Sequence, residues 1–281
     1  GYFIKGGMYK LIDTLTTLCI KENITLNFNT KVKNITLVNN KINGVTVIAN
    51  QKEQFINADI VVSNSDVLNT YKNLLTFKDN KKINKYENLE TSSSAIVFYW
   101  GIKGTYKQLK LHNILFSNNY EQEFDELFNK KIIPTDPTIY IYISSKESLN
   151  DAPVEHENWF VMINSPINEK QNWDEELLKL KEKLILKINK TLDVNISNNI
   201  IFEKTLTPKD IETLTESYKG SLYGIASNNK MAAFLREQNR SSKYSGLYFV
   251  GGSVHPGGGI PLVMLSAKIT SELITKYNPI V

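Results

Sequence analysis

The sequence predicts a mixed α/β fold in which helices and strands alternate along the chain. Three observations support this prediction. Apolar and β-branched runs that are typical of strands gather in two blocks, residues 30–63 and residues 92–166. Residues 173–192 carry leucine and isoleucine at helical spacing. Near the C-terminus, residues 246–274 combine a short apolar run, a glycine-rich turn and another helical pattern.

The composition indicates an ordinary folded protein. The 281 residues are 41% hydrophobic and 22% charged, which is enough to build a substantial core. The net charge of +4 comes almost wholly from lysine, since Arg236 and Arg240 are the only arginines, and we expect no nucleic-acid partner. Cys19 is the only cysteine, so no internal disulfide is possible and a cytoplasmic location is expected. No run approaches 18 apolar residues, so any membrane association should be peripheral.

The N-terminal part of the chain predicts one helix followed by short strands. Apolar residues recur at helical spacing over residues 9–20, and alternation over residues 24–28 predicts a strand. The block from 30 to 63 contains several short apolar runs separated by asparagine-rich turns, one of them at Asn39 and Asn40.

The middle block predicts one sheet with helices after it. Its aromatic and β-branched runs are residues 92–102, 138–144 and 158–166. The amphipathic helix 173–192 and a strand at 200–203 follow. Thr207 and Pro208 then give a capped start to a helix over 207–215.

The turn after the last strand is the strongest signal for a ligand. It contains five closely spaced glycines and one histidine, and Pro261 follows in the position favoured in a first helical turn. Glycines let the backbone approach a ligand closely, and the positive end of a helix favours an anion or an electron-rich group. A tight structural turn is the alternative. The histidine, His255, could act on a ligand held there.

At this point the sequence shows a clear resemblance. The stretch GLYFVGGSVHPGGGIPLVMLSAKITSELI resembles the C-terminal signature of the phytoene desaturase (carotenoid dehydrogenase) family, within the flavin-containing amine oxidase superfamily. The resemblance implies an FAD-dependent, amine-oxidase-like two-domain flavoprotein fold. It also implies that the turn and the helix start face the flavin, through Gly251, Gly252, Gly257, Gly258, Gly259 and Ile260. Val32 would meet the adenine end of FAD through its backbone, with a place in the strand core as the alternative.

The resemblance also divides the chain. Flavoproteins of this superfamily open with a GxGxxG unit, and no such unit follows a strand near Gly1. We therefore interpret the chain as the C-terminal portion of a longer protein, with a fold truncated at its N-terminus. Residues 1–75 and 200–281 are expected to belong to the FAD-binding domain. Residues 76–199 are expected to form a substrate-binding domain.

The implied function is desaturation of an acyclic carotenoid or carotenoid precursor, of the phytoene, dehydrosqualene or hydroxycarotenoid 3,4-desaturase type. Phe98, Trp100, Tyr140 and Tyr142 are expected to wall an apolar tunnel for the polyene, although a place in the sheet core is the competing interpretation. The tunnel is expected to meet the glycine turn. Peripheral membrane attachment is expected because such substrates lie in membranes.

The sequence does not identify a catalytic acid or base, and His255 is the one candidate. No group of Cys and His has metal-ligand spacing, so no metal site is expected. Other members of the superfamily stay open as alternatives, namely an isoprenoid saturase or isomerase, or an amine oxidase. An inactive fragment that binds lipid is a further alternative.

Overall fold

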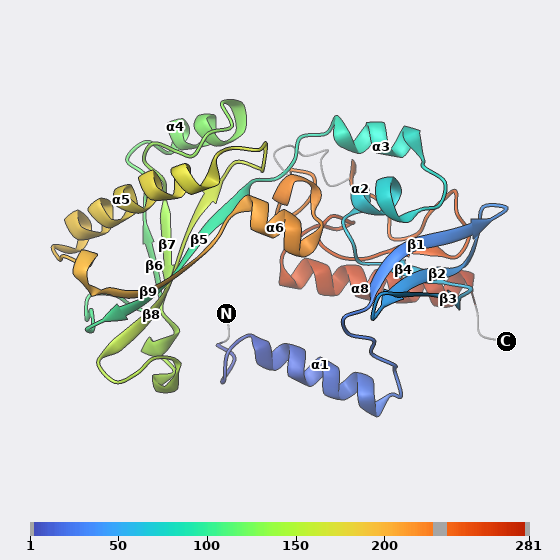
Figure 1. The fold of residues 1–281 in the computed structure, drawn as a ribbon, viewed down its shortest axis with the longest axis horizontal. Coiled ribbons are helices and arrows are strands. Elements are labelled where there is room, and N and C mark those ends of the chain that lie inside the picture. The colour runs from blue at the N-terminus through green and yellow to red at the C-terminus, as the bar shows by residue number, and fades with distance from the viewer. Residues whose placement is uncertain (1–2, 227–234, 279–281) are drawn as a thin grey trace. The chain divides into compact units, whose positions relative to one another are not determined.

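The computed structural model describes residues 3–226 and 235–278 (Figure 1). The chain divides into two compact units. The sheet unit comprises Gly1–Phe28, Ala95–Pro166 and Lys170–Thr207, and the glycine-turn unit comprises Asn29–Ser94, Ile167–Glu169 and Pro208–Val281. This division differs from the predicted one in two ways: residues 1–28 and 200–207 group with the sheet, and residues 76–94 and 167–169 group with the glycine turn.

The sheet unit is built on a five-stranded sheet within the described residues, with the order β6-β7-β8-β5-β9. Its elements are α1 (Tyr9–Lys21), β5 (Ser94–Lys103), β6 (His112–Leu115), α4 (Tyr120–Phe124), β7 (Ile139–Tyr142), β8 (His156–Ser165), α5 (Trp173–Leu192) and β9 (Ile200–Leu206). The pairs β6–β7, β7–β8 and β5–β9 are antiparallel. The predicted strands of the middle block and the amphipathic helix are therefore confirmed.

The two faces of this sheet differ. Along β8, buried and half-buried residues alternate over the whole strand, so alternate side chains point to opposite faces. One face packs against α5 and forms a solid apolar core, in which Leu180, Leu184 and Ile188 meet residues such as Ile141 and Val161. The other face carries exposed and half-buried aromatic side chains, among them Tyr99 and Phe160.

The glycine-turn unit combines an antiparallel sheet with a parallel strand pair. Its elements are β1 (Lys31–Val38), β2 (Lys41–Ala49), β3 (Lys52–Asn57), β4 (Val61–Ser63), α2 (Val67–Asn69), α3 (Asn80–Glu87), α6 (Pro208–Thr215), β10 (Leu247–Phe249) and α8 (Ile260–Tyr277). The order β1-β2-β3 is antiparallel, and β10 pairs in parallel with β4. Asn39 and Asn40 adopt φ of 49° and 60° between β1 and β2, which confirms the predicted turn.

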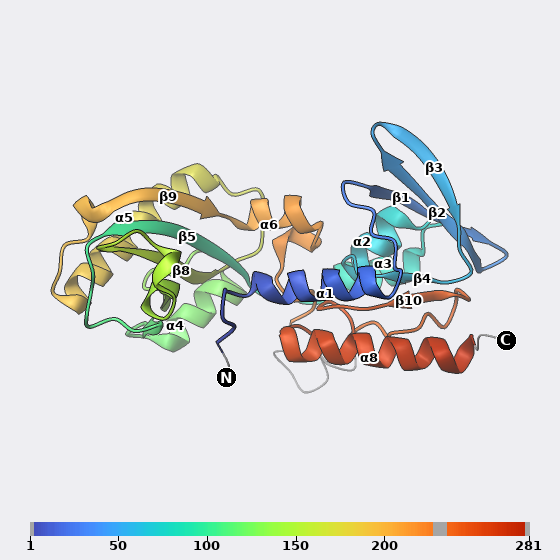
Figure 2. The ribbon, with the colours of Figure 1, turned by 90° about the horizontal axis from the view of Figure 1, so that it is seen from below.

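Helix α8 lies along β10 and is held there by small polar side chains (Figures 1 and 2). Its buried residues are Ser266 and Thr270. Asn239 donates to the hydroxyl of Ser266 at 2.9 Å, and the Thr270 hydroxyl donates to the carbonyl of Phe249 at 2.9 Å. The small side chains let the helix backbone approach the strand closely. The apolar residues that predicted the helix, such as Leu262 and Leu265, are exposed on its other side.

Two features of the N-terminal part differ from what the spacing of its apolar residues predicts. The predicted helix forms as α1, but none of its residues is buried. The predicted strand over residues 24–28 is wrong, because that segment is extended or turning chain without strand pairing. Alternation predicts a strand only where a neighbouring strand can satisfy the backbone hydrogen bonds.

Candidate functional site

The first candidate site lies at the carboxyl ends of the parallel pair β4 and β10. The amide of Val250 donates to the carbonyl of Ser63 at 3.0 Å, so the loops that follow both strands leave the pair at the same edge. Ligands of α/β proteins bind preferentially outside the carboxyl ends of parallel strands. The glycine turn is one of these loops, and residues 64–66 form the other.

Gly251 opens the turn at a point of close contact. Its φ of 112° disfavours any residue with a side chain, and a Cβ at this position would lie 2.4 Å from Oδ1 of Asn64. Its amide donates to the hydroxyl of Ser266 at 3.3 Å. The loop after β4, the turn and helix α8 therefore meet at this glycine.

A side chain at position 258 would clash with the ring of Tyr223, so the position requires a glycine. A Cβ on Gly258 would lie 2.0 Å from Cδ1 of that ring. The buried Arg236 fixes the loop that carries Tyr223, because its guanidinium donates to the carbonyls of Tyr223 and Ile225 at 2.7 Å and of Gly252 at 2.8 Å. Burial lowers the pKa of Arg236 from its usual value. Gly257 lies beside the same guanidinium, with its Cβ position 3.4 Å from Nε.

The start of α8 is open. Gly259 has a φ of 94°, and nothing lies within 4 Å of the place where its Cβ would be. Ile260 is exposed, and the first backbone bond of the helix runs from Val263 to Gly259 at 2.9 Å. The amide of Ile260, ahead of Pro261, therefore takes no part in the hydrogen bonds of the helix and lies at its positive end.

Val32 lines a cavity of about 420 Å³ in the same unit. The cavity extends from β1 to the carboxyl end of β4, where Ser63, Asn64 and Ser65 line it. An adjoining cavity of about 560 Å³ is also lined by Val32. The structure therefore brings Val32 and the loop beside Gly251 to one hollow region.

A polar cluster forms part of the lining of these cavities. Lys31 Nζ lies 2.6 Å from Oε1 of Glu216, and Asn69 donates to Oε2 of the same carboxylate at 3.0 Å. The hydrogen bond from Lys31 lowers the pKa of Glu216, against the effect of burial. The carboxylate thus stays ionised and holds Lys31 at the edge of the cavity.

His255 lies inside the turn and is half-buried. Its amide donates to the carbonyl of Glu237 at 2.9 Å. Its Nδ1 is buried and finds no hydrogen-bonding partner among the residues that the structure describes. The ring therefore has an unused polar atom next to the glycines.

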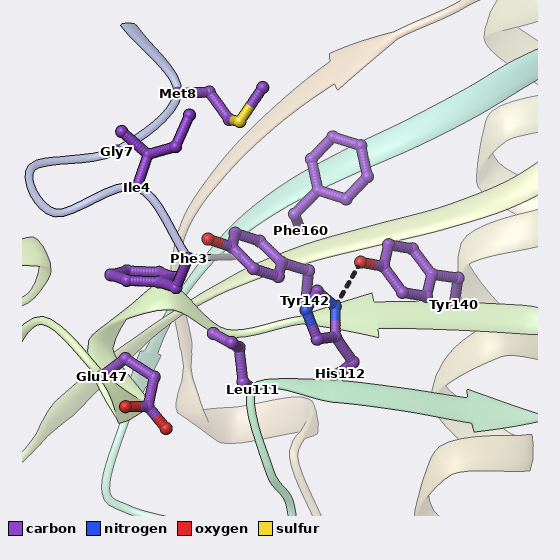
Figure 3. A pocket seen from close by; sticks show the side chains of 10 residues that line it. All are labelled: Phe3, Ile4, Gly7, Met8, Leu111, His112, Tyr140, Tyr142, Glu147 and Phe160. Carbon is purple, nitrogen blue, oxygen red and sulfur yellow. Dashed lines mark hydrogen bonds between the residues drawn. The ribbon is translucent and has the colours of Figure 1, made fainter. Parts of the chain in front are cut away.

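The second candidate site is a cavity of about 790 Å³ on the open face of the five-stranded sheet (Figure 3). Its lining is mainly apolar and aromatic: Phe3, Ile4, Gly7, Met8, Leu111, His112, Tyr140, Tyr142, Glu147 and Phe160. The aromatic surface continues along the sheet, since Phe160 lies edge-on to Tyr99 and to Tyr140 at ring distances of 5.5 Å and 6.3 Å.

The structure separates the four aromatic residues that were expected to wall a tunnel. Tyr140 and Tyr142 line the cavity. Phe98 and Trp100 point to the other face and lie in the core against α5, with exposed fractions of 1% and 2%. The indole of Trp100 donates to Glu203 at 2.7 Å. Because successive side chains of a strand point to opposite faces, Tyr99, which lies between Phe98 and Trp100 on β5, is on the open face.

Several residues that position these sites were missed. Tyr223, Asn64 and Glu216 act through contacts between segments far apart in the sequence, and no local pattern indicates them. Arg236 could have been found, because it is one of only two arginines in a lysine-rich chain and lies shortly before the glycine turn. His112 also has no local pattern that indicates a site, and its side chain is exposed to the cavity.

Two kinds of feature are absent from the described residues, 3–226 and 235–278. No group of three or more His, Cys, Asp or Glu side chains is placed to hold a metal ion. No helix there has the length and apolar character that crossing a membrane requires.

Solved structures share the fold. An oxidoreductase from Methanosarcina mazei superposes with a TM-score of 0.60 at 16% identity, over 95% of this chain and 54% of that one. A putrescine oxidase variant gives 0.53 at 10% identity, over 96% of this chain and 53% of that one. The predicted fold class, mixed α/β of the amine oxidase type, is confirmed.

Sequence comparison is more specific, although no protein-family model matches the chain. A 1-hydroxycarotenoid 3,4-desaturase from Flavobacterium sp. (strain P99-3) is 49% identical over 277 residues, which cover 99% of this chain and 56% of that protein. A 4,4'-diaponeurosporene oxygenase from Staphylococcus haemolyticus is 36% identical over 275 residues, 97% of this chain and 54% of that protein. The chain thus spans about half the length of these curated relatives. It belongs to the carotenoid desaturase family.

Proposed function

We propose that this chain functions as an FAD-dependent oxidoreductase that introduces a double bond into an acyclic carotenoid. The observation that carries the proposal is the aromatic, largely apolar cavity on the open face of the sheet, in a chain 49% identical to a hydroxycarotenoid desaturase. A linear polyene offers apolar surface along most of its length. Its binding free energy must come from burying that surface, at about 25 cal/mol per Å².

The glycine-turn unit fits the cofactor. Gly259 leaves an open space at the start of α8, the cavity beside Val32 reaches the loop at Gly251, and His255 carries an unused nitrogen. In the proposal the backbone of Val32 holds the adenine end. The turn residues Gly251, Gly252, Gly257, Gly258, Gly259 and Ile260 hold the flavin end. When bound, FAD supplies the electron acceptor for oxidation of a CH–CH bond.

The chain's own residues have binding roles in this reaction. Phe160, Tyr140 and Tyr142 provide a flat apolar surface for the extended chain of the substrate and exclude water from it. Arg236 holds the carbonyl of Gly252, in the turn, next to the carbonyl of Tyr223 and so positions the turn against that loop. Such a reaction needs orientation of the substrate more than acid–base groups.

Peripheral attachment to a membrane belongs to the proposal, because acyclic carotenoids dissolve in lipid. Large apolar residues are exposed along α1, among them Tyr9, Ile12 and Ile20. They could contact the interface region of a bilayer. Sedimentation with phospholipid vesicles tests this point, and a protein that stays in the supernatant contradicts it.

The function is tested by expressing the gene that encodes this chain in a host that accumulates acyclic carotenoids, with and without a terminal hydroxyl. We expect a product with one more conjugated double bond and a red-shifted absorption. Phe160→Asp should lower the conversion, and Phe116→Asp, an exposed position outside the cavity lining, should not.

Loss of a double bond from the carotenoid, or a change in the geometry of a double bond, would favour a saturase or isomerase. Unchanged carotenoids together with oxidation of amines would favour an amine oxidase, and no chemistry with retained lipid binding would indicate an inactive protein.

A further inference from the structure

The cavity on the open face of the sheet contains one hydrogen-bonded polar pair, His112 and Tyr140, and its other polar side chains are Tyr142 and Glu147. Most of its other lining atoms are apolar, from side chains such as Phe3, Met8 and Phe160. Figure 3 shows the imidazole and the phenol pointing toward each other inside this lining. A polar pair in an apolar cavity fixes the orientation of a ligand that is itself mostly apolar.

The strands hold the pair in a fixed geometry. His112 on β6 lies directly opposite Tyr142 on β7, and Tyr140 is two residues before Tyr142 on the same face. His112 Nδ1 lies 2.8 Å from the Tyr140 hydroxyl. The imidazole ring also stacks on Tyr140 at 6.0 Å and contacts the ring of Tyr142 at 5.2 Å. The direction of its second nitrogen, Nε2, is therefore set by contacts on two sides.

The pair has one donor and one acceptor left for a ligand. If the phenol donates to Nδ1, then Nε2–H is a free donor and the phenol oxygen keeps an acceptor lone pair. If Nδ1–H donates to the phenol oxygen, then the phenol O–H is the donor and Nε2 is the acceptor. Within the described part of the chain, Nε2 has no hydrogen-bonding partner. Burial raises the pKa of Tyr140, so the phenol keeps its proton at neutral pH.

This pattern matches an alcohol. A hydroxyl group is both a donor and an acceptor, whereas a carbonyl only accepts and a hydrocarbon end does neither. We propose that the His112–Tyr140 pair binds a terminal hydroxyl of the polyene and makes the cavity selective for hydroxylated acyclic substrates. This inference rests on the proposed function. The apolar remainder of the substrate lies on the aromatic surface of Phe160 and Tyr99.

The inference is tested by binding rather than by turnover. The protein is titrated in detergent micelles with an acyclic carotenoid that carries one terminal tertiary hydroxyl, and with the same carotenoid without it, while intrinsic fluorescence is recorded. We expect the hydroxylated compound to bind about three- to tenfold more tightly, the range given by one or two neutral hydrogen bonds in a partly open site. Tyr140→Phe and His112→Leu should bring both affinities to that of the hydrocarbon. Tyr142→Phe removes a hydroxyl from the same cavity but not from the pair, and should leave the ratio unchanged.

The outcomes separate the two proposals. Equal affinity of the wild-type protein for both compounds, or a Tyr140→Phe variant that keeps the preference, overturns the inference and leaves polyene binding intact. If neither polyene binds, the proposed substrate class fails as well. Circular dichroism of each variant checks that the sheet is folded. Tyr140→Phe keeps the ring, so a loss of preference in that variant is due to the hydroxyl.

Discussion

The guanidinium of Arg236 donates a hydrogen bond of 2.8 Å to the carbonyl of Gly252, and through the same side chain the turn is tied to the loop at Tyr223 and Ile225. Neither loop is part of a helix or a strand, so side-chain hydrogen bonds such as these help to hold the two loops together. A planar, forked donor can satisfy three carbonyls at once, and an ammonium group cannot match its geometry. This buried side chain therefore links the glycine turn to the loop that carries Tyr223.

Arg236→Lys should destabilise the protein by about 2–3 kcal/mol, because the buried carbonyls lose donors that are charged. Thermal and urea unfolding measure the effect. Arg240→Lys is the matched control, since Arg240 lies 4.0 Å over the ring of Tyr277 and its replacement should cost about 1 kcal/mol or less. Equal losses in the two variants would show that Arg236 does not hold the turn.

Gly258→Ala should perturb the turn through Tyr223. The added methyl group would meet the ring at 2.0 Å, so the ring or the turn has to move. A double-mutant cycle with Tyr223→Ala isolates this clash. We expect Gly258→Ala to lower both the melting temperature and flavin content in the wild-type background, and much less in the Tyr223→Ala background. Without such coupling, the ring is not the reason for the glycine.

Neighbouring aromatic residues on β5 should behave differently. Trp100→Ala should cost about 3–5 kcal/mol, because it empties a core position that is 2% exposed and removes the bond to Glu203. Tyr99→Ala, at 38% exposure on the open face, should cost clearly less and instead weaken polyene binding. Urea unfolding and the binding titration together check the assignment of the two faces. A stable Trp100→Ala variant with impaired binding would reverse it.

Acid stability should depend on Asp79. Its buried carboxylate accepts from Lys243 Nζ at 2.9 Å and from the Lys82 amide at 3.2 Å. Burial acts to raise its pKa, but these donors prevail and hold it below the usual 3.8. A lowered pKa stabilises the fold above 3.8 and the stabilisation is lost as the pH falls through the lowered value. Asp79→Asn should thus reduce the unfolding free energy at neutral pH, and the difference from wild type should shrink in acid. A constant difference across the range would contradict this.

The sequence predicts the strands and helices well where local pattern and tertiary contact agree. The Asn39–Asn40 turn, the strands of the middle block and helix α8 form as expected. Apolar and polar residues alternate over 24–28 as they do in a strand, but this segment has no strand pairing in the structure. Alternation alone does not show whether a neighbouring strand is present to pair with.

The candidate site was only partly predictable. Trp100 and Tyr140 are both aromatic residues within predicted strands. Alternation along a strand separates the two faces of the sheet, but it does not show which face a helix will cover. Contacts such as Tyr223 with Gly258 join residues distant in the sequence, so they appear only in the folded chain. The helical face of α8 was also misleading, because small polar residues, Ser266 and Thr270, are the buried ones.

The central claim is that the protein oxidises a CH–CH bond of an acyclic carotenoid with a bound flavin. The most direct measurement mixes the purified, flavin-loaded protein with a hydroxylated acyclic carotenoid in the absence of oxygen. The account predicts that the absorption of oxidised flavin disappears as a carotenoid with one more conjugated double bond appears in equal amount. Flavin that stays oxidised in the presence of saturating, bound carotenoid would contradict it.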